Sequence, residues 1–218
     1  MGTAAKTHKR PPVKREIRTA KASNADRAIG ELSRGMEVFV LTYGQFSLID
    51  AVATLVRKTG PAEVYLSTWT AGHTDLTTAA ALLEDAQIAR LRMVVDRSFV
   101  TRQPGYCRRM LDLFGSDCIR TWRGHAKFAV VKNDQWTLAV RTSMNLNTNP
   151  RLETIEVSDD TALAAFLTDI VDELFVEQPA DVFDGELPEL ASIPTVDPGK
   201  IQMGKASAAP TPQTTMRT

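Results

Sequence analysis

The sequence predicts an α/β fold in which a mixed, mainly parallel sheet is flanked by helices. Short apolar runs at 36–41, 63–67 and 90–95 alternate with longer stretches at 46–57 and 75–85. The runs have the length and apolar content of buried strands, whereas the longer stretches have the apolar spacing, or the alanine and leucine content, of helices. This alternating order of strand and helix favours parallel strands with covering helices.

The segment before the first strand is strongly basic. Residues 1–34 contain nine Lys and Arg against three Asp and Glu, which leaves a net charge of +6 in a chain of zero net charge. We expect residues 1–22 to be loosely ordered and a short helix to run from a cap at Ser23 or Asn24 to Ser33, before Gly35. A basic arm suits nucleic acid or another polyanion, and a solvated tail without a partner is an equally good interpretation.

The third strand is followed by a predicted polar loop, a helix, a strand and a hairpin. We expect the loop at 96–103, the helix from Pro104 to Phe114 because proline suits a first helical turn, and the strand at 117–121. The hairpin has apolar runs at 126–131 and 136–140 joined by a turn over Asn133-Asp134-Gln135. Its head carries the most informative polar residues of the chain.

A last strand and a long helix close the predicted domain. The strand covers 152–157, and Asp159 or Asp160 can cap the helix that follows. The apolar spacing predicts an inward face made of Leu163, Phe166, Leu167, Ile170, Val171 and Leu174. We therefore predict a basic arm with a short helix at 1–34, an α/β domain at 35–177, and a poorly ordered tail at 178–218 that is acidic and then rich in Pro, Ala and Thr.

The bulk composition excludes several classes of protein. No apolar run approaches the roughly 20 residues that a membrane-spanning helix needs, and the basic N-terminus lacks the apolar core of a signal peptide. The two cysteines, Cys107 and Cys118, do not have metal-ligand spacing. We expect a cytoplasmic protein with no membrane contact, no metal and no other cofactor. We expect its thiols to be reduced, and a disulfide between them is the alternative that the sequence leaves open.

The candidate site combines His125 and Lys127 with Ser143 and Asn145. The period of two in a strand places His125 and Lys127 on one face. Burial of an ammonium group without a partner is costly, so this pair beside a Ser/Asn loop favours a shared anionic ligand. A nucleophile or base, a cation and neutral donors together suit a phosphate ester. By contrast, His73 lies beside Thr74 and Asp75 in a loop, where a capping or solvated role is the better interpretation.

These residues resemble the signature of the phospholipase D superfamily. That signature is His-x-Lys, four residues, Asp, a gap and Gly-Ser-x-Asn, and His125-x-Lys127 and Ser143-x-Asn145 match its ends. Glu153 resembles the glutamate that follows the signature, and the resemblance covers about residues 36–176. The chain departs from the pattern at Lys132, where the family has Asp, at Thr142, where it has Gly, and in a longer gap between the two halves.

The resemblance implies a two-step phosphodiester transfer without metal. One signature copy implies a homodimer with two His125–Lys127 pairs across a two-fold axis. One His125 would form a covalent phosphohistidine, while the second would protonate the leaving oxygen and then activate water. Lys127 and Asn145 would hold the phosphate oxygens, Ser143 would donate another hydrogen bond, and Glu153 would orient His125.

The arginines and the basic arm favour nucleic acid, with DNA held through its backbone, as the substrate. The group comprises Arg97, Arg102, Arg108, Arg109, Arg120 and Arg123. The candidate substrate-binding residues are Arg97, Arg102, Arg123, Gln45 and Asn147. The segment 143–151 also resembles phage or prophage members of the superfamily. Lys132 and Thr142 favour the alternative of a catalytically degenerate module that binds nucleic acid or a phage or host protein, and a third interpretation is an interaction protein that works through its tails.

Overall fold

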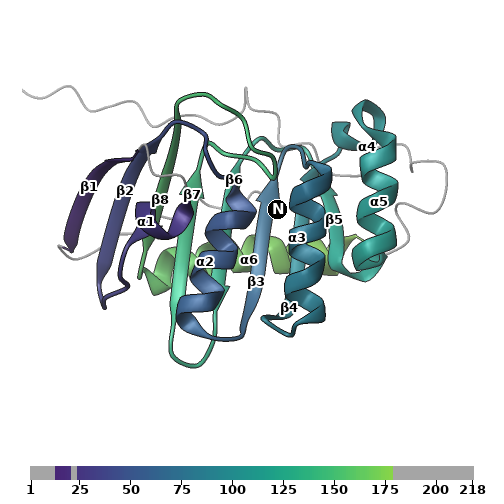
Figure 1. Cartoon of the computed structure of the whole chain (residues 1–218). Helices are drawn as coiled ribbons and strands as arrows, with labels where there is room; N and C mark the ends of the chain where they lie inside the picture. The colour runs from purple at the N-terminus through teal and green to yellow at the C-terminus, as the bar shows by residue number, and fades with distance from the viewer. Residues whose placement is uncertain (1–12, 21–23, 179–218) are drawn as a thin grey trace, which may run out of the picture. The chain divides into compact units, whose positions relative to one another are not determined.

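The fold is built on one mixed β-sheet. The computed structural model describes residues 13–20 and 24–178. Its strands are β1 (Lys14–Ala20), β2 (Met36–Thr42), β3 (Ala62–Thr68), β4 (Ile88–Asp96), β5 (Ile119–Trp122), β6 (Lys127–Lys132), β7 (Thr137–Thr142) and β8 (Glu153–Ser158). Within these ranges the order across the sheet is β1-β2-β8-β7-β6-β3-β4-β5 (Figure 1). β6 and β8 run against the direction of the other strands, so the prediction of a mixed sheet flanked by helices is confirmed.

Helices cover both faces of this sheet. They are α1 (Ala25–Ile29), α2 (Leu48–Thr59), α3 (His73–Glu84), α4 (Ser98–Arg102), α5 (Pro104–Phe114) and α6 (Thr161–Glu177). On one face α2, α3 and α5 bury the larger core, in which Leu55, Leu66 and Met93 are fully inaccessible. On the other face α6 crosses the sheet (Figure 1) and packs Leu167 and Val171 against it.

The position of the hairpin decides where the polar loops meet. β6, β7 and β8 lie between β2 and β3, so the carboxyl ends of β2, β3 and β7 lie beside the amino ends of β6 and β8. The register places Lys127 opposite Thr142, and Thr42 opposite Glu153. Binding sites in open α/β sheets gather at the carboxyl ends of parallel strands, and this edge collects the loops that carry the predicted site.

The N-terminal segment is more ordered than its composition suggested. Lys14–Ala20 forms β1, which pairs in parallel with β2 at the edge of the sheet; the prediction of a loosely ordered segment is wrong for these residues. The segment is polar because an edge strand needs only one partner and tolerates charges. Arg15 also bonds Glu37 at 2.8 Å. The remaining residues of the predicted arm before 13, the gap at 21–23 and the predicted tail after 178 lie outside the described residues.

Several element boundaries differ from the predictions. Asn24 caps α1 by accepting the Arg27 N–H at 3.0 Å, but the helix ends at Gly30 (φ 73°) and not at Gly35. The predicted loop at 96–103 contains α4. The predicted inward face of α6 is wrong at Phe166, which is 44% exposed.

Candidate functional site

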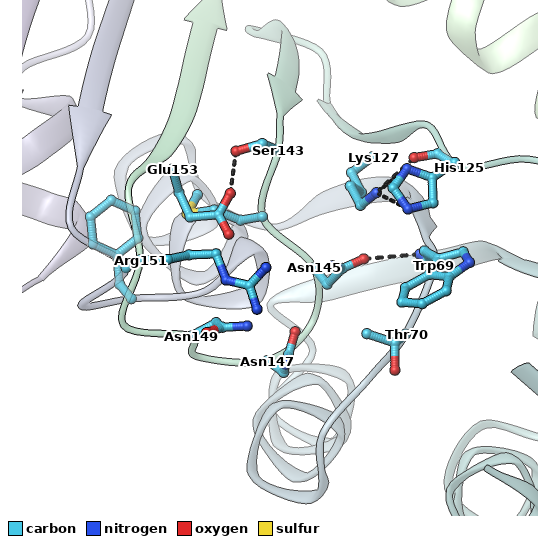
Figure 2. Close-up of a pocket in the computed structure, with 13 residues that line it drawn as sticks. Trp69, Thr70, His125, Lys127, Ser143, Asn145, Asn147, Asn149, Arg151 and Glu153 are labelled. Atoms are coloured by element: carbon cyan, nitrogen blue, oxygen red, sulfur yellow. Dashed lines mark hydrogen bonds between the residues drawn. The ribbon is translucent and has the colours of Figure 1, made fainter. Parts of the chain in front are cut away.

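A polar pocket opens at the carboxyl edge of the sheet. Its volume is about 380 Å³, and Figure 2 shows side chains from several loops converging on it. The lining residues are Gly44, Phe46, Trp69, Thr70, His125, Lys127, Ser143, Met144, Asn145, Asn147, Asn149, Arg151 and Glu153. The pocket therefore unites the five predicted catalytic residues, which come from 125 to 153 in the sequence.

Lys127 provides a buried cation at the pocket wall. It is the first residue of β6, and the residue is only 9% exposed. Its Nζ donates to the His125 carbonyl at 2.8 Å and lies 2.8 Å from His125 Nδ1 (Figure 2). Burial lowers the pKa of Lys127, while the carboxylates of Glu153 and Asp96 act in the opposite direction. An ammonium that has already lost water is well suited to hold an anion.

His125 shares the pocket with Lys127 for a different reason from the predicted one. It precedes β6 and is exposed in the loop after β5, so the prediction that strand periodicity aligns the pair is wrong. The contact arises because the Lys127 side chain reaches back to the ring, with Nε2 also within 3.3 Å of Nζ. The imidazole packs against Trp69, with ring centroids 5.2 Å apart and planes at 53°.

Asn145 and Ser143 reach the pocket from the loop after β7. The Asn145 Oδ1 accepts the backbone N–H of Trp69 at 3.2 Å. Both side-chain hydrogen bonds of Asn145 among the described residues use Oδ1, so the Nδ2 amide can donate to a ligand in the pocket. Ser143 accepts the Thr154 N–H at 2.9 Å and donates to Glu153.

Glu153 supports Ser143 and makes no hydrogen bond to His125 among the described residues. The prediction that Glu153 orients His125 is therefore wrong for this arrangement. The reason is positional, because Glu153 begins β8, and β7 lies between β8 and the strand that follows His125. Orientation of the imidazole falls instead to Lys127 and Trp69.

The predicted substrate-binding residues have different positions. Asn147 lines the pocket. Arg102 lies at its rim, with the guanidinium 3.8 Å from the Trp69 ring and a 3.0 Å bond to the Trp69 carbonyl. Gln45 accepts the Tyr43 N–H at 3.0 Å within its own loop and does not line the pocket.

The other arginines of the predicted group lie outside the pocket lining. Arg97 follows β4 and Arg123 is exposed two residues before His125. Arg120 is only 7% exposed and donates to the carbonyls of Gln178 at 2.8 Å and Ser116 at 2.9 Å. Arg120 therefore ties the end of α6 to β5 and is not available to nucleic acid.

Several residues that the sequence pattern did not single out also line the pocket. Arg151 is exposed, forms no ion pair among the described residues, and points towards Asn145 and Asn147 (Figure 2). Trp69 and Thr70 follow β3, and Asn149 lies in the loop before β8. The loop before β8 reaches the pocket because β8 runs antiparallel to β2 and β7, an arrangement that has no local signal in the sequence. The pocket therefore has two cations, Lys127 and Arg151, against the single carboxylate of Glu153.

The described part of the chain contains no group of three or more His, Cys, Asp and Glu side chains that could hold a metal ion. No helix in the same residues has the length and apolar character needed to cross a bilayer.

A carboxylate is buried in the first turn of α3. Asp75, in the first turn of α3, is 6% exposed, and its Oδ1 has no hydrogen-bond partner among the described residues. Burial raises the pKa of Asp75, a bond from Ser47 lowers it, and the charge of Asp50 raises it further. Asp75 therefore holds its proton more tightly in the folded than in the unfolded chain.

We expect Asp75→Asn to gain stability relative to the wild type as the pH rises. The unfolded carboxyl ionises near its usual value of 3.8, whereas the folded one resists, so ionisation favours unfolding until the pH passes the folded pKa. Urea unfolding from pH 3 to pH 7 should show the wild type losing free energy of unfolding relative to the variant. Asp112→Asn, an exposed carboxyl on α5, is the control. A pH-independent difference for Asp75→Asn would contradict the assignment.

Comparisons with known proteins find similarity in structure and none in sequence. No protein family model matches the sequence, and no curated protein matches it. The solved structures that it resembles include NucT from Helicobacter pylori, at 13% identity over 64% of this chain and 96% of that chain with a TM-score of 0.45. TrmBL2, an archaeal chromatin protein, has 10% identity over 67% of this chain and 54% of that one, with a TM-score of 0.40. The chain is also similar to Nuc from Salmonella typhimurium, a phospholipase D family member, at 12% identity over 64% of this chain and 95% of that chain with a TM-score of 0.46.

Proposed function

We propose that this protein is a metal-independent phosphodiesterase that cleaves nucleic acid, with DNA as the expected substrate. The observation that carries the proposal is the pairing of His125 with the buried Lys127, at 2.8 Å, beside the unused amide donor of Asn145. A nucleophilic ring nitrogen, a desolvated cation and a neutral donor are the groups that phosphoryl transfer requires. The exposed Arg151 adds a second cation for the flanking backbone.

The proposed reaction proceeds through a phosphohistidine. A ring nitrogen of one His125 attacks phosphorus, the bond from phosphorus to the leaving oxygen breaks, and a second His125 gives that oxygen its proton. The second imidazole then takes a proton from water, whose oxygen attacks phosphorus and breaks the P–N bond. Lys127, Asn145 and Arg151 hold the non-bridging oxygens, where negative charge must be stabilised.

The second His125 comes from a second copy of the chain in this proposal. Among the described residues, α6 packs chiefly on β4, β5, β6 and β7, so no described helix covers the β1 and β2 side of that sheet face. On that side Ile17 of β1 lies next to Phe39 of β2, and Ile17 is 74% exposed. Tyr43 and Leu152, both exposed apolar side chains, continue from there to the edge that holds the pocket. A two-fold dimer over this surface would bury apolar area and place two pockets together.

The two departures from the family signature, Lys132 and Thr142, are not among the residues that line the pocket. Lys132 ends β6, five residues and about 17 Å of extended strand from Lys127. The Thr142 hydroxyl donates to the Thr154 carbonyl at 2.6 Å and accepts the Met144 N–H at 3.0 Å. Thr142 thus helps to shape the loop that carries Ser143 and Asn145. Neither position specifically favours the alternative of a degenerate binding module.

Cleavage of DNA in the presence of a chelator tests the proposal. Purified full-length protein is incubated with single- and double-stranded DNA in EDTA, and the products are separated on denaturing gels. We expect cleavage in EDTA that weakens steeply with salt, because the contacts are to phosphates. Activity that appears only when a divalent cation is added would overturn the metal-free mechanism. Salt-sensitive binding without cleavage would favour the binding module.

A further inference from the structure

The imidazole of His125 lies outside the sheet, so strand register does not hold it in place. The structure instead places it in a closed ring of contacts. Three segments contribute to this ring: the end of β4 with α4, the loop after β3, and the loop before β6. Each contact in this closed circuit is a hydrogen bond or the packing of one side chain on the indole of Trp69, and all of them lie within the described residues.

Asp96 provides the first part of the ring. It ends β4 and is 8% exposed. Its Oδ2 accepts the N–H of Gly124, the residue before His125, at 3.2 Å. Its Oδ1 accepts the Ser98 N–H at 2.9 Å and also the Ser98 hydroxyl. The two oxygens of one carboxylate thus join the His125 loop to the start of α4.

Arg102 provides the second part and closes the ring. Its Nε donates to Ser98 Oγ at 3.0 Å and its Nη2 to the Trp69 carbonyl at 3.0 Å. The guanidinium also lies over the indole of Trp69, which packs against the His125 imidazole as well. Because Arg102 covers Trp69, the indole serves as a wall for His125 and not as a free stacking surface.

We propose that Asp96 is a positioning residue that, through Gly124, Ser98, Arg102 and Trp69, fixes the His125 imidazole against Lys127. The effect on turnover rests on the proposed function, whereas the effect on the position of the His125 imidazole does not. A nucleophile must approach phosphorus in line and at near-contact distance, so a small displacement of the ring is costly to the rate. The nearby Asp96 carboxylate also favours the charged form of Lys127, against the effect of burial on its pKa.

The first experiment measures the position of the ring without any activity. The chain has three histidines, and the His125 signal in a ¹H–¹³C spectrum is assigned by its loss in His125→Gln. We expect Asp96→Asn, Ser98→Ala and Trp69→Ala each to move this signal, because the ring current of the indole acts on it. Trp69→Phe should retain part of the shift. Asp112→Asn, an exposed carboxyl on α5, is the matched control and should leave the signal in place.

The second experiment measures turnover in the same variants. We expect Asp96→Asn to lower kcat on the order of 100-fold with little change in KM, and Trp69→Phe to stay closer to the wild type than Trp69→Ala. Melting curves check that each variant is folded. If the His125 signal of folded Asp96→Asn and Ser98→Ala coincides with that of the wild type, the positioning role is overturned, whatever the activity. If the wild type cleaves nothing, the proposed function fails, and the spectra alone decide the positioning role.

Discussion

His125→Ala is expected to lower DNA cleavage by about 10⁴-fold or more while leaving the protein folded. The proposed reaction uses His125 as the nucleophile and as the general acid, and either role alone contributes a large factor to the rate. His125 is exposed in a loop before β6, so its truncation removes little buried contact. Initial rates in EDTA, measured against His73→Ala, test the expectation. His73 is an exposed histidine in the first turn of α3 and lies outside the pocket.

Mixtures of the two chains separate a joint site from independent sites. Wild type and His125→Ala are unfolded together, refolded at several ratios, and assayed. If each reaction needs two His125 side chains, activity should fall as the square of the wild-type fraction. If each chain acts alone, activity should fall in direct proportion to it. Full cleavage by pure His125→Ala would remove His125 from the mechanism altogether.

The sequence predicted where the strands lie along the chain better than it predicted their order in the sheet. The strands at β2, β3 and β4 carry continuous apolar runs because they are covered on at least one face, and such runs are visible without a structure. The insertion of β6, β7 and β8 between β2 and β3 left no local signal, since strand order depends on packing between distant segments. The basic β1 was missed for a related reason, because backbone pairing with β2 and the bond from Arg15 to Glu37 hold it.

The sequence predicted which residues form the candidate site better than it predicted how they are arranged. His125 and Lys127 do meet, but through a lysine side chain that turns back and not through strand periodicity. Arg102 and Arg120 looked alike in the sequence, yet the first lies over Trp69 at the pocket rim and the second is buried against Gln178. Whether an arginine is exposed or buried depends on the residues that the fold places beside it. A single sequence does not show which residues these are.

Gly44→Ala is expected to disrupt the pocket and destabilise the fold more than an ordinary glycine substitution. Gly44 has φ +71°, and a Cβ there would lie 1.8 Å from the Asn149 carbonyl oxygen and 2.9 Å from the Arg151 nitrogen. These are backbone atoms, so no side-chain rotation relieves the overlap. The loop before β8 must move, and Asn149 and Arg151 move with it. We expect the free energy of unfolding to fall by about 2 kcal/mol or more and cleavage to fall in the fraction that stays folded.

Gly35→Ala supplies the matched control for this substitution. Gly35 has nearly the same backbone angle, φ +68°, but nothing lies within 4 Å of a Cβ built there. Its variant therefore measures the strain of the left-handed backbone alone, which costs roughly 1 kcal/mol, and should keep full activity. Urea unfolding of both variants separates strain from overlap, since only Gly44→Ala contains the second. Equal stability and equal activity of the two variants would mean that the loops at 44 and 149 do not touch, and then neither Asn149 nor Arg151 would be held at the phosphate.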